Sequence, residues 1–302
     1  TVQTRLGYSY DGDLRAGEYR ASVSYQRFFP KFNLGYKNRV RTGSTDQVGL
    51  RWRENVVDLS VNIPMNWHRY NHRYYVQWAG GTSIVDRYGL ELSQPHAEAE
   101  KRFVDQIRFP FQTAISFGHN VRSSALDVAP RWGQHLSISY RYFQNNRLNQ
   151  GEKSSHWMWR STFYFPGIAA HHSTSIRLNY QRGAGTYAQL NEIPLVSGYD
   201  QLDPRPVRNT VLLAYRFPLA YPDWEIGSVM YVKRLRSGLF TDFENVNRRR
   251  PFDRGPRSLG VELQADFHLF RFYLPQFTAG TKLIYAPENR SFLMTYGISY
   301  SY

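Results

Sequence analysis

The last eleven residues of the chain alternate strictly between two kinds of side chain. The aromatic or aliphatic positions are Phe292, Met294, Tyr296, Ile298, Tyr300 and Tyr302. Between them lie Leu, Thr, Gly and two Ser residues. Successive side chains of a β-strand point to opposite faces, so one face of this segment is apolar and the other mostly small and polar. About 9–11 residues are enough for a tilted strand to cross a bilayer. The segment therefore predicts a membrane-crossing strand.

The same alternation recurs along most of the chain. In 136–142, 176–180 and 259–267, for example, apolar residues alternate with Ser, Arg, Asn, Gln, Gly, Glu or Asp. In lipid such a stripe needs no covering layer, provided that the sheet closes and leaves no unpaired edge. The predicted strands are 1–10, 18–28, 31–42, 46–66, 73–86, 106–118, 133–143, 155–165, 173–182, 209–217, 234–245, 257–269, 275–286 and 291–302.

We therefore expect an all-β fold, a transmembrane antiparallel up-and-down β-barrel of about 14 strands. Residues 1–302 are expected to form a single outer-membrane barrel domain. The long segment 46–66 leaves open a hairpin at Arg53-Glu54-Asn55, which would change the strand count. Two connections on the predicted inner side, 119–132 and 218–233, are longer than the usual short turns of that side.

Composition favours the barrel over a soluble β-sandwich. Aromatic residues make up 16% of the chain. The mean hydropathy is nonetheless negative, and no apolar run approaches the 18 or so residues of a membrane-spanning helix. Both facts fit a barrel, because only alternate residues meet lipid. The chain should lie in the outer membrane of a Gram-negative bacterium, against lipid and lipopolysaccharide.

The chain is strongly basic, with 38 Lys and Arg against 24 Asp and Glu and a formal charge of +14. The arginines are spread over the predicted strands rather than gathered in one patch. We interpret them as lumen residues and as interface residues that face anionic headgroups, and expect no nucleic-acid partner. The chain has no cysteine, which excludes disulfides and thiolate metal sites.

Five segments resemble the bacterial surface antigen superfamily, whose members are outer-membrane assembly and two-partner secretion barrels. The segments are Ser124–Gln134, Leu195–Tyr199, Tyr215–Leu219, Leu239–Phe243 and Ser258–Leu263. The resemblance implies a barrel of sixteen strands in which the first strand of this chain is the third. Missing strands and any periplasmic domain would then precede Thr1. The resemblance extends to the Bacteroidetes-type variant with a β-propeller before the barrel.

The resemblance also implies a functional loop, 183–208, that folds into the lumen and carries Ser197, Gly198 and Tyr199. In the family, an arginine of this loop pairs with the aspartate of a "Phe-x-Asp" strand, which is Asp242 here. Ser197 occupies the arginine position, so another cation would have to serve Asp242. The candidate cations are Arg205, Arg208 and Arg216.

The acidic residues of the last strands predict a charged inner wall. Asp242, Glu262 and Asp266 should face arginines such as Arg216, either along a solute path or, as we favour, in a network of ion pairs between strands. We expect neither a metal site nor a cofactor. His68 and His72 lie in a predicted turn without a carboxylate nearby. The chain has no Gly-x-Ser-x-Gly elbow, and we expect no enzymatic activity.

By this resemblance, the predicted function is insertion or export of polypeptide through the lumen loop and a lateral seam. The seam would lie at the strand 292–302, whose backbone would pair with an entering client strand. Client polypeptides and periplasmic or lipoprotein subunits are the expected partners. Two alternatives stay open, namely a porin-like channel that favours anions, and a barrel that only anchors an upstream periplasmic domain.

Overall fold

The computed structural model describes most of the chain. The described residues are 2–11, 16–25, 29–45, 48–95, 97, 100, 103, 105–124, 126–145, 152–185, 193–199, 207–246, 257–270 and 276–301. Tyr302 and Arg205 lie outside them.

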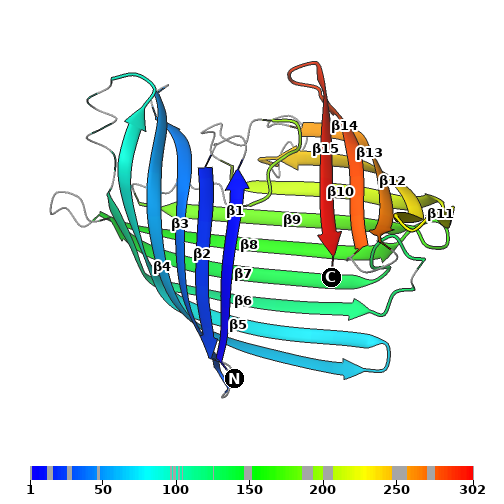
Figure 1. Ribbon diagram of the computed structural model, residues 1–302, viewed down its shortest axis with the longest axis horizontal. Coiled ribbons are helices and arrows are strands. Elements are labelled where there is room, and N and C mark those ends of the chain that lie inside the picture. Colours follow the sequence, from blue (N-terminus) through cyan, green and yellow to red (C-terminus); the bar gives the residue numbers. More distant parts are fainter. Residues whose placement is uncertain are drawn as a thin grey trace.

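The fold is a single antiparallel sheet in which each long strand pairs with its neighbours in the sequence (Figure 1). The strands are β1 (Val2–Asp11), β2 (Ala16–Tyr25), β3 (Lys31–Thr45), β4 (Val48–Arg69), β5 (His72–Leu92), β6 (Gln106–Val121), β7 (Gly133–Asn145), β8 (Glu152–Pro166), β9 (Ser173–Ala184), β10 (Asn209–Ala220), β11 (Trp224–Ile226), β12 (Met230–Glu244), β13 (Arg257–Leu269), β14 (Gln276–Ala286) and β15 (Ser291–Ser301). The short β11 pairs only with β12, so fourteen strands form the continuous path.

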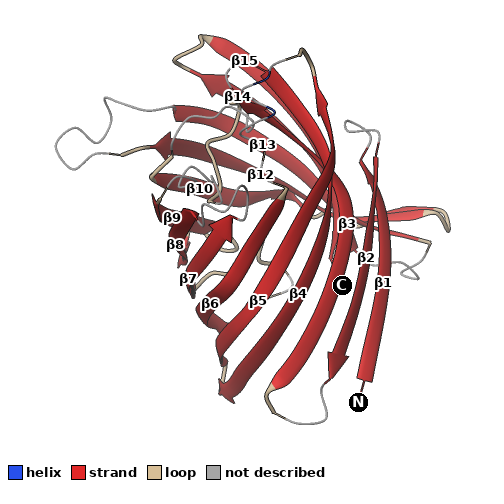
Figure 2. Ribbon diagram, turned by 90° about the vertical axis from the view of Figure 1, so that its left-hand side faces the viewer, coloured by secondary structure: helices blue, strands red, loops and turns tan. Residues whose placement is uncertain are grey.

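The sheet curls on itself, with β3–β9 as one wall and β12–β15 arching over from the other side (Figure 2). Among the described residues, β1 and β15 are the two edges of the sheet. The predicted up-and-down order is confirmed. We call the end with the turns β4–β5 and β8–β9 the short-turn end, and the end with the connection 185–208 the long-loop end.

One face of the sheet carries exposed apolar side chains and the other carries buried polar ones, as expected for a barrel surrounded by lipid. On β13, Leu259, Val261 and Leu263 are each about half exposed, whereas Ser258, Glu262 and Asp266 are buried. A water-soluble sheet would bury the aliphatic side chains instead. The apolar face is therefore the outer face and the polar face lines the interior, as in a transmembrane barrel. No helix in the described part of the chain has the length and apolarity needed to cross a membrane.

Two details differ from the sequence-based expectation. The hairpin considered at Arg53-Glu54-Asn55 does not exist, because β4 is continuous over 22 residues. Glu54 is 3% exposed and its Oε1 lies 2.6 Å from Arg39 Nε, so this polar stretch is an ion-paired part of the inner wall. The long connection 218–233 contains the unpredicted β11, which forms a small hairpin with β12.

The apolar core lies inside the barrel. Ile193 and Val207, from the connection between β9 and β10, pack with Met158 of β8 and with Leu195. Inner walls of barrels are normally polar, so this cluster places Ile193, Leu195 and Val207 of the connection inside the lumen.

Candidate functional site

The interior site is organised along β12. Its inner face carries Arg234, Arg236, Gly238, Asp242 and Glu244, of which Arg234, Asp242 and Glu244 are almost fully buried. At about 3.3 Å per residue, Asp242 and Arg234 are roughly 26 Å apart along the strand. The inner face of β12 therefore presents a carboxylate, Asp242, near the long-loop end and a guanidinium, Arg234, near the short-turn end.

We call residues 193–199 the outer loop. Val196 is fully buried, and the backbone N–H of Ser197 donates to Asp242 Oδ2 at 3.2 Å. The Ser197 hydroxyl also hydrogen-bonds the Asp242 carboxylate. The loop thus binds β12 through donors that carry no charge.

Two further contacts hold the outer loop against the wall. Thr210 Oγ1 donates to the carbonyl of Pro194 at 2.9 Å, and Thr210 itself is completely buried. Gly198 has φ +84°, in the left-handed region, and a Cβ at this position would lie 2.8 Å from Ile284 Cγ2. Only glycine fits both the backbone conformation and the space at this turn.

Tyr199 ends the outer loop at the long-loop end of the barrel. Its hydroxyl donates to Glu288 Oε2 in the β14–β15 turn, and the hydroxyl oxygen also lies 2.9 Å from the carbonyl oxygen of Arg257. Burial alone would raise the pKa of Glu288. The Tyr199 hydroxyl and backbone donors outweigh it, with a smaller contribution from the charge of Arg257, and the net pKa is lowered. Glu288 therefore holds the loop as a carboxylate.

Arg216, one of the arginines expected to serve Asp242, is engaged elsewhere. Arg216 Nε lies 2.5 Å from Glu262 Oε1, and the backbone N–H of Arg208 donates to Asn245 Oδ1. Arg205 lies outside the described residues. In the described ranges, no Lys or Arg nitrogen lies within 4 Å of the Asp242 carboxylate. The expectation of a cation at Asp242 is therefore not met by Arg208 or Arg216, because loop donors bind the carboxylate instead.

Midway along β12, the wall carries a row of paired charges. Arg216, Gly238 and Glu262 are register partners on β10, β12 and β13. A Cβ on Gly238 would lie 2.9 Å from Glu262 Oε1, so the missing side chain lets Glu262 reach across β12 to Arg216. Lys282 Nζ approaches Glu262 from the other side at 3.9 Å. These contacts form the network of ion pairs between strands that we favoured.

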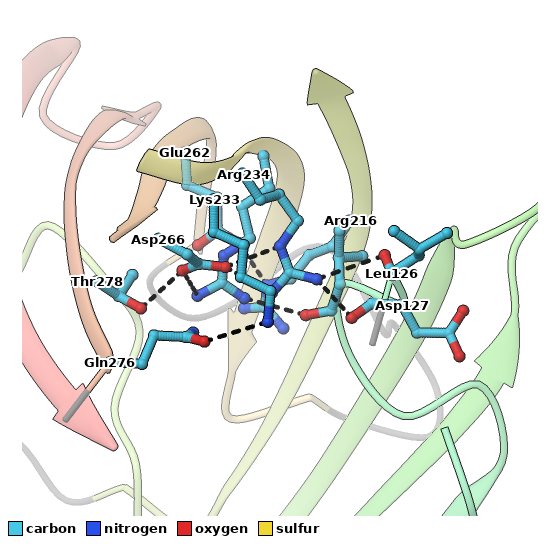
Figure 3. A network of polar contacts seen from close by, with 11 residues as sticks. Leu126, Asp127, Arg216, Lys233, Arg234, Glu262, Asp266, Gln276 and Thr278 are labelled. Atoms are coloured by element: carbon cyan, nitrogen blue, oxygen red, sulfur yellow. Dashed lines mark hydrogen bonds and ion pairs between the residues drawn. The ribbon is translucent and has the colours of Figure 1, made fainter. Parts of the chain in front are cut away.

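Asp266 is the centre of a second network, near the short-turn end (Figure 3). It is 0% exposed, and its carboxylate contacts Arg234 Nη2 at 2.5 Å and Arg236 Nη2 at 3.2 Å. Thr278 Oγ1 donates to it at 2.7 Å. Two arginines on one buried carboxylate leave a net positive charge, so further acceptors are required.

Those acceptors are backbone carbonyls of the connection between β6 and β7, residues 122–132, which we call the inner loop. Arg234 Nη1 donates to the carbonyl of Asp127 at 2.6 Å (Figure 3), and Arg236 Nη1 donates to that of Val128 at 3.0 Å. Val128 is 4% exposed. The inner loop thus reaches strand β12, more than 100 residues away in the sequence.

The other side of the inner loop is held by the β8–β9 turn and by the segment after β10. His171 Nδ1 lies 2.8 Å from Asp127 Oδ1, and Ser173 Oγ donates to the carbonyl of Pro130 at 2.8 Å. Tyr221 donates its hydroxyl hydrogen to the carbonyl of Leu126 at 2.6 Å. Burial raises the pKa of Tyr221, so this donor keeps its proton at neutral pH.

Sequence reasoning did not identify Arg234 and Arg236 as site residues. A β-bulge at Lys233 shifts the register between Val232 and Arg234. In the predicted strand 234–245, which begins after the bulge, alternation places Arg234 and Arg236 on the same face as Asp242. The basic run from Lys233 to Arg236, beside the overlong connection 119–132, was the available signal.

The predicted seam strand β15 presents an apolar face. Phe292, Met294, Tyr296 and Ile298 are exposed by 71%, 51%, 77% and 76%. Tyr300 lies in β15, but the environment of its side chain is not described, and Tyr302 lies outside the described residues. Whether these residues form a functional seam stays a prediction. No group of three or more potential metal ligands occurs among the described residues.

The chain was compared with known protein families, sequences and structures, and only the structures gave a match. No family model and no curated protein sequence matches the chain. CdiB from Acinetobacter baumannii aligns with a TM-score of 0.54 at 13% identity, over 100% of this chain and 53% of that one. CdiB from Escherichia coli aligns with a TM-score of 0.51 at 10% identity, over 94% and 52%. The chain has the fold of the CdiB barrel.

The chain spans about half the length of both CdiB structures. BamA from Haemophilus ducreyi lacking POTRA domains 1-3 also aligns, with a TM-score of 0.47 at 12% identity, over 99% of this chain and 70% of that one. At these identities the two CdiB alignments establish the fold alone, and the fold class predicted from the sequence is confirmed.

Proposed function

We propose that this chain is an outer-membrane barrel of the assembly or translocation type, in a Gram-negative bacterium, that exports or inserts polypeptide. The observation that carries the proposal is the outer loop, which enters the lumen and binds Asp242 of β12 through Ser197. Support also comes from the fold shared with CdiB and from the sequence resemblance to the surface antigen superfamily. The sixteen-strand barrel, the single domain over residues 1–302, the propeller-fused variant and the lateral seam belong to the proposal as predictions.

The state of the lumen arginines favours this proposal over an anion-selective porin. An anion path needs positive charges that are free to meet solutes. Arg216 is paired with Glu262, while Arg234 and Arg236 are paired with Asp266 and the inner loop. The positive charges along the inner face of β10 and β12 are thus already used to hold the structure.

The test uses the loop-release variant Asp242→Ala in the native organism, with Leu178→Ala on the lipid-facing side of β9 as the matched control. Quantitative comparison of surface and secreted proteins should show loss of one or a few polypeptides in the first variant only, at equal barrel levels. Single-channel recording of both purified proteins completes the experiment. Steady anion-selective conductance with unchanged exported proteins would overturn the proposal in favour of the porin.

A further inference from the structure

The inner loop differs from the other connections at the short-turn end. The β4–β5 turn is formed by Tyr70 and Asn71 alone, and the β8–β9 turn by residues 167–172. Residues 122–132 instead cross to β12, where two arginines bind them. A connection between neighbouring strands does not need to bind a strand that lies four strands beyond β7 along the sheet.

The chemistry of the contact is that of a releasable latch. Both arginines donate to main-chain carbonyls, so the contact carries no second charge that would have to be separated on opening. Arg234 and Arg236 also keep Asp266 as a partner when the loop leaves. Release therefore breaks the hydrogen bonds to the loop carbonyls but leaves each arginine next to the Asp266 carboxylate, and water that enters the opened lumen can take the place of the carbonyl acceptors.

We propose that the inner loop is a second plug, which closes the lumen at the short-turn end and is latched to β12 by Arg234 and Arg236. It rests on the proposed function, since a polypeptide that enters from the short-turn end has to displace the inner loop before it meets the outer loop. The lumen is then closed by two loops from opposite ends, both held by the inner face of β12. The His171–Asp127 contact and the arginine contacts hold the two sides of the loop, and both sides have to part when the loop opens.

The first test removes the hydrogen-bond donor Arg236 and leaves the buried Asp266 carboxylate with its other partners. Arg236→Met retains Arg234 and Thr278 on Asp266. The matched control is Arg39→Met on β3, which also removes an inward arginine from a buried carboxylate, Glu54, while Arg41 stays 3.5 Å and Arg87 3.9 Å away. A hydrogen bond from a charged donor corresponds to about 10-fold to 100-fold in an equilibrium.

The readout is single-channel recording of the full-length protein in planar bilayers. Arg236→Met should raise the frequency of opening by about 10-fold or more, whereas Arg39→Met should stay near the native frequency. Equal behaviour of the two variants would refute the latch. Export of polypeptides, measured separately with Asp242→Ala, can succeed or fail independently, so failure of the latch is distinguishable from failure of the proposed function.

A second variant joins the inner loop to the β8–β9 turn through a disulfide. It keeps the proposal testable if Arg236→Met folds poorly. The chain has no cysteine, so a pair introduced as Val128→Cys and His171→Cys is unique. The two residues are joined by a backbone hydrogen bond from Val128 N to His171 O at 3.5 Å. Oxidation of this pair, with or without Arg236→Met, should suppress opening, and reduction should restore it. Opening that is indifferent to oxidation would overturn the proposal.

Discussion

The outer and inner loops meet the same strand, β12, but by different means. The outer loop brings apolar side chains and a neutral N–H donor to Asp242, and buries Ile193 and Val196 completely or nearly so. The inner loop brings main-chain carbonyls to Arg234 and Arg236, and among its described residues Val128 is the one apolar residue buried to a similar degree. Burial of apolar side chains therefore contributes more to holding the outer loop, whereas hydrogen bonds to backbone carbonyls contribute more to holding the inner loop.

This difference has a consequence for how each contact can fail. Substitutions in the outer loop itself should release it, because the burial of Val196, the turn at Gly198 and the contact of the Tyr199 hydroxyl depend on its residue types. Substitutions in the inner loop should matter less than substitutions in its arginine partners, because any residue supplies a carbonyl. The outer loop is therefore the more specific element and the inner loop the more easily reversible one.

The largest effect is expected from removal of the carboxylate that binds the outer loop. Asp242→Ala leaves the Ser197 N–H without its acceptor in a buried place, at a cost of about 1–3 kcal/mol. The released fraction of the loop should rise by about 5-fold to 100-fold. Limited proteolysis of the intact protein, with mapping of cuts between residues 185 and 208, measures it. The isosteric Asp242→Asn retains an acceptor oxygen and should be cut much more slowly, and equal cutting of the two variants would contradict this account.

A smaller effect is expected at Gly198, where strain and space act together. Gly198→Ala forces a side chain into the left-handed region, at about 1–2 kcal/mol, and places a Cβ against Ile284. The same proteolysis should show faster cutting of the outer loop. Gly227→Ala is the matched control, because Gly227 has φ +54° but nothing within 4 Å of a Cβ, and it lies in the β11–β12 turn. Equal loosening of the outer loop by the control would mean that the effect does not arise from the local environment of Gly198.

The wall between the two loops offers a test of whether they are independent. Gly238→Ala would press a Cβ against Glu262 and the Tyr215 carbonyl, and overpacking of this kind costs about 1–3 kcal/mol. Thermal unfolding, followed by the heat-dependent shift in electrophoretic mobility, should occur at a lower temperature, with both loops still protected from protease. Gly297→Ala on β15, where a Cβ meets nothing within 4 Å, should unfold like the native protein. Joint release of both loops would mean that the wall couples them.

Most of the fold was predictable because the β-strand period leaves little freedom. Alternation of period two assigns every residue to the inside or the outside, so the strands and their antiparallel order follow from the sequence alone. The exceptions are local. Trp224–Ile226 is too short a strand to show a period, and the polar run at Arg53-Glu54-Asn55 resembled a turn because Glu54 lies among arginines of the inner wall.

The site was predictable only where side chains carry the recognition. The outer loop and Asp242 could be placed through a resemblance based on residue types, although the engagement of Arg216 with Glu262 could not. The inner latch left little trace in the sequence. Its acceptors are backbone carbonyls, which every residue has, so the side chains of residues 122–132 do not mark them as partners of Arg234 and Arg236. Alternation from Asp242 placed both arginines on the inner face but did not show what they bind.

The smallest effect concerns the far end of the outer loop, where Glu288 lies against Tyr199. Its pKa is lowered in the folded protein from the ordinary 4.5. A carboxyl group with a lowered pKa contributes stability above its unfolded pKa and loses it as the pH falls through the folded value. The Tyr199 end of the loop should therefore loosen only below about pH 4.5. Hydrogen exchange of the amides at 193–199, corrected for intrinsic rates, measures this step. In Glu288→Gln, which cannot ionise, the step should vanish, and its persistence would assign the pH dependence to another group.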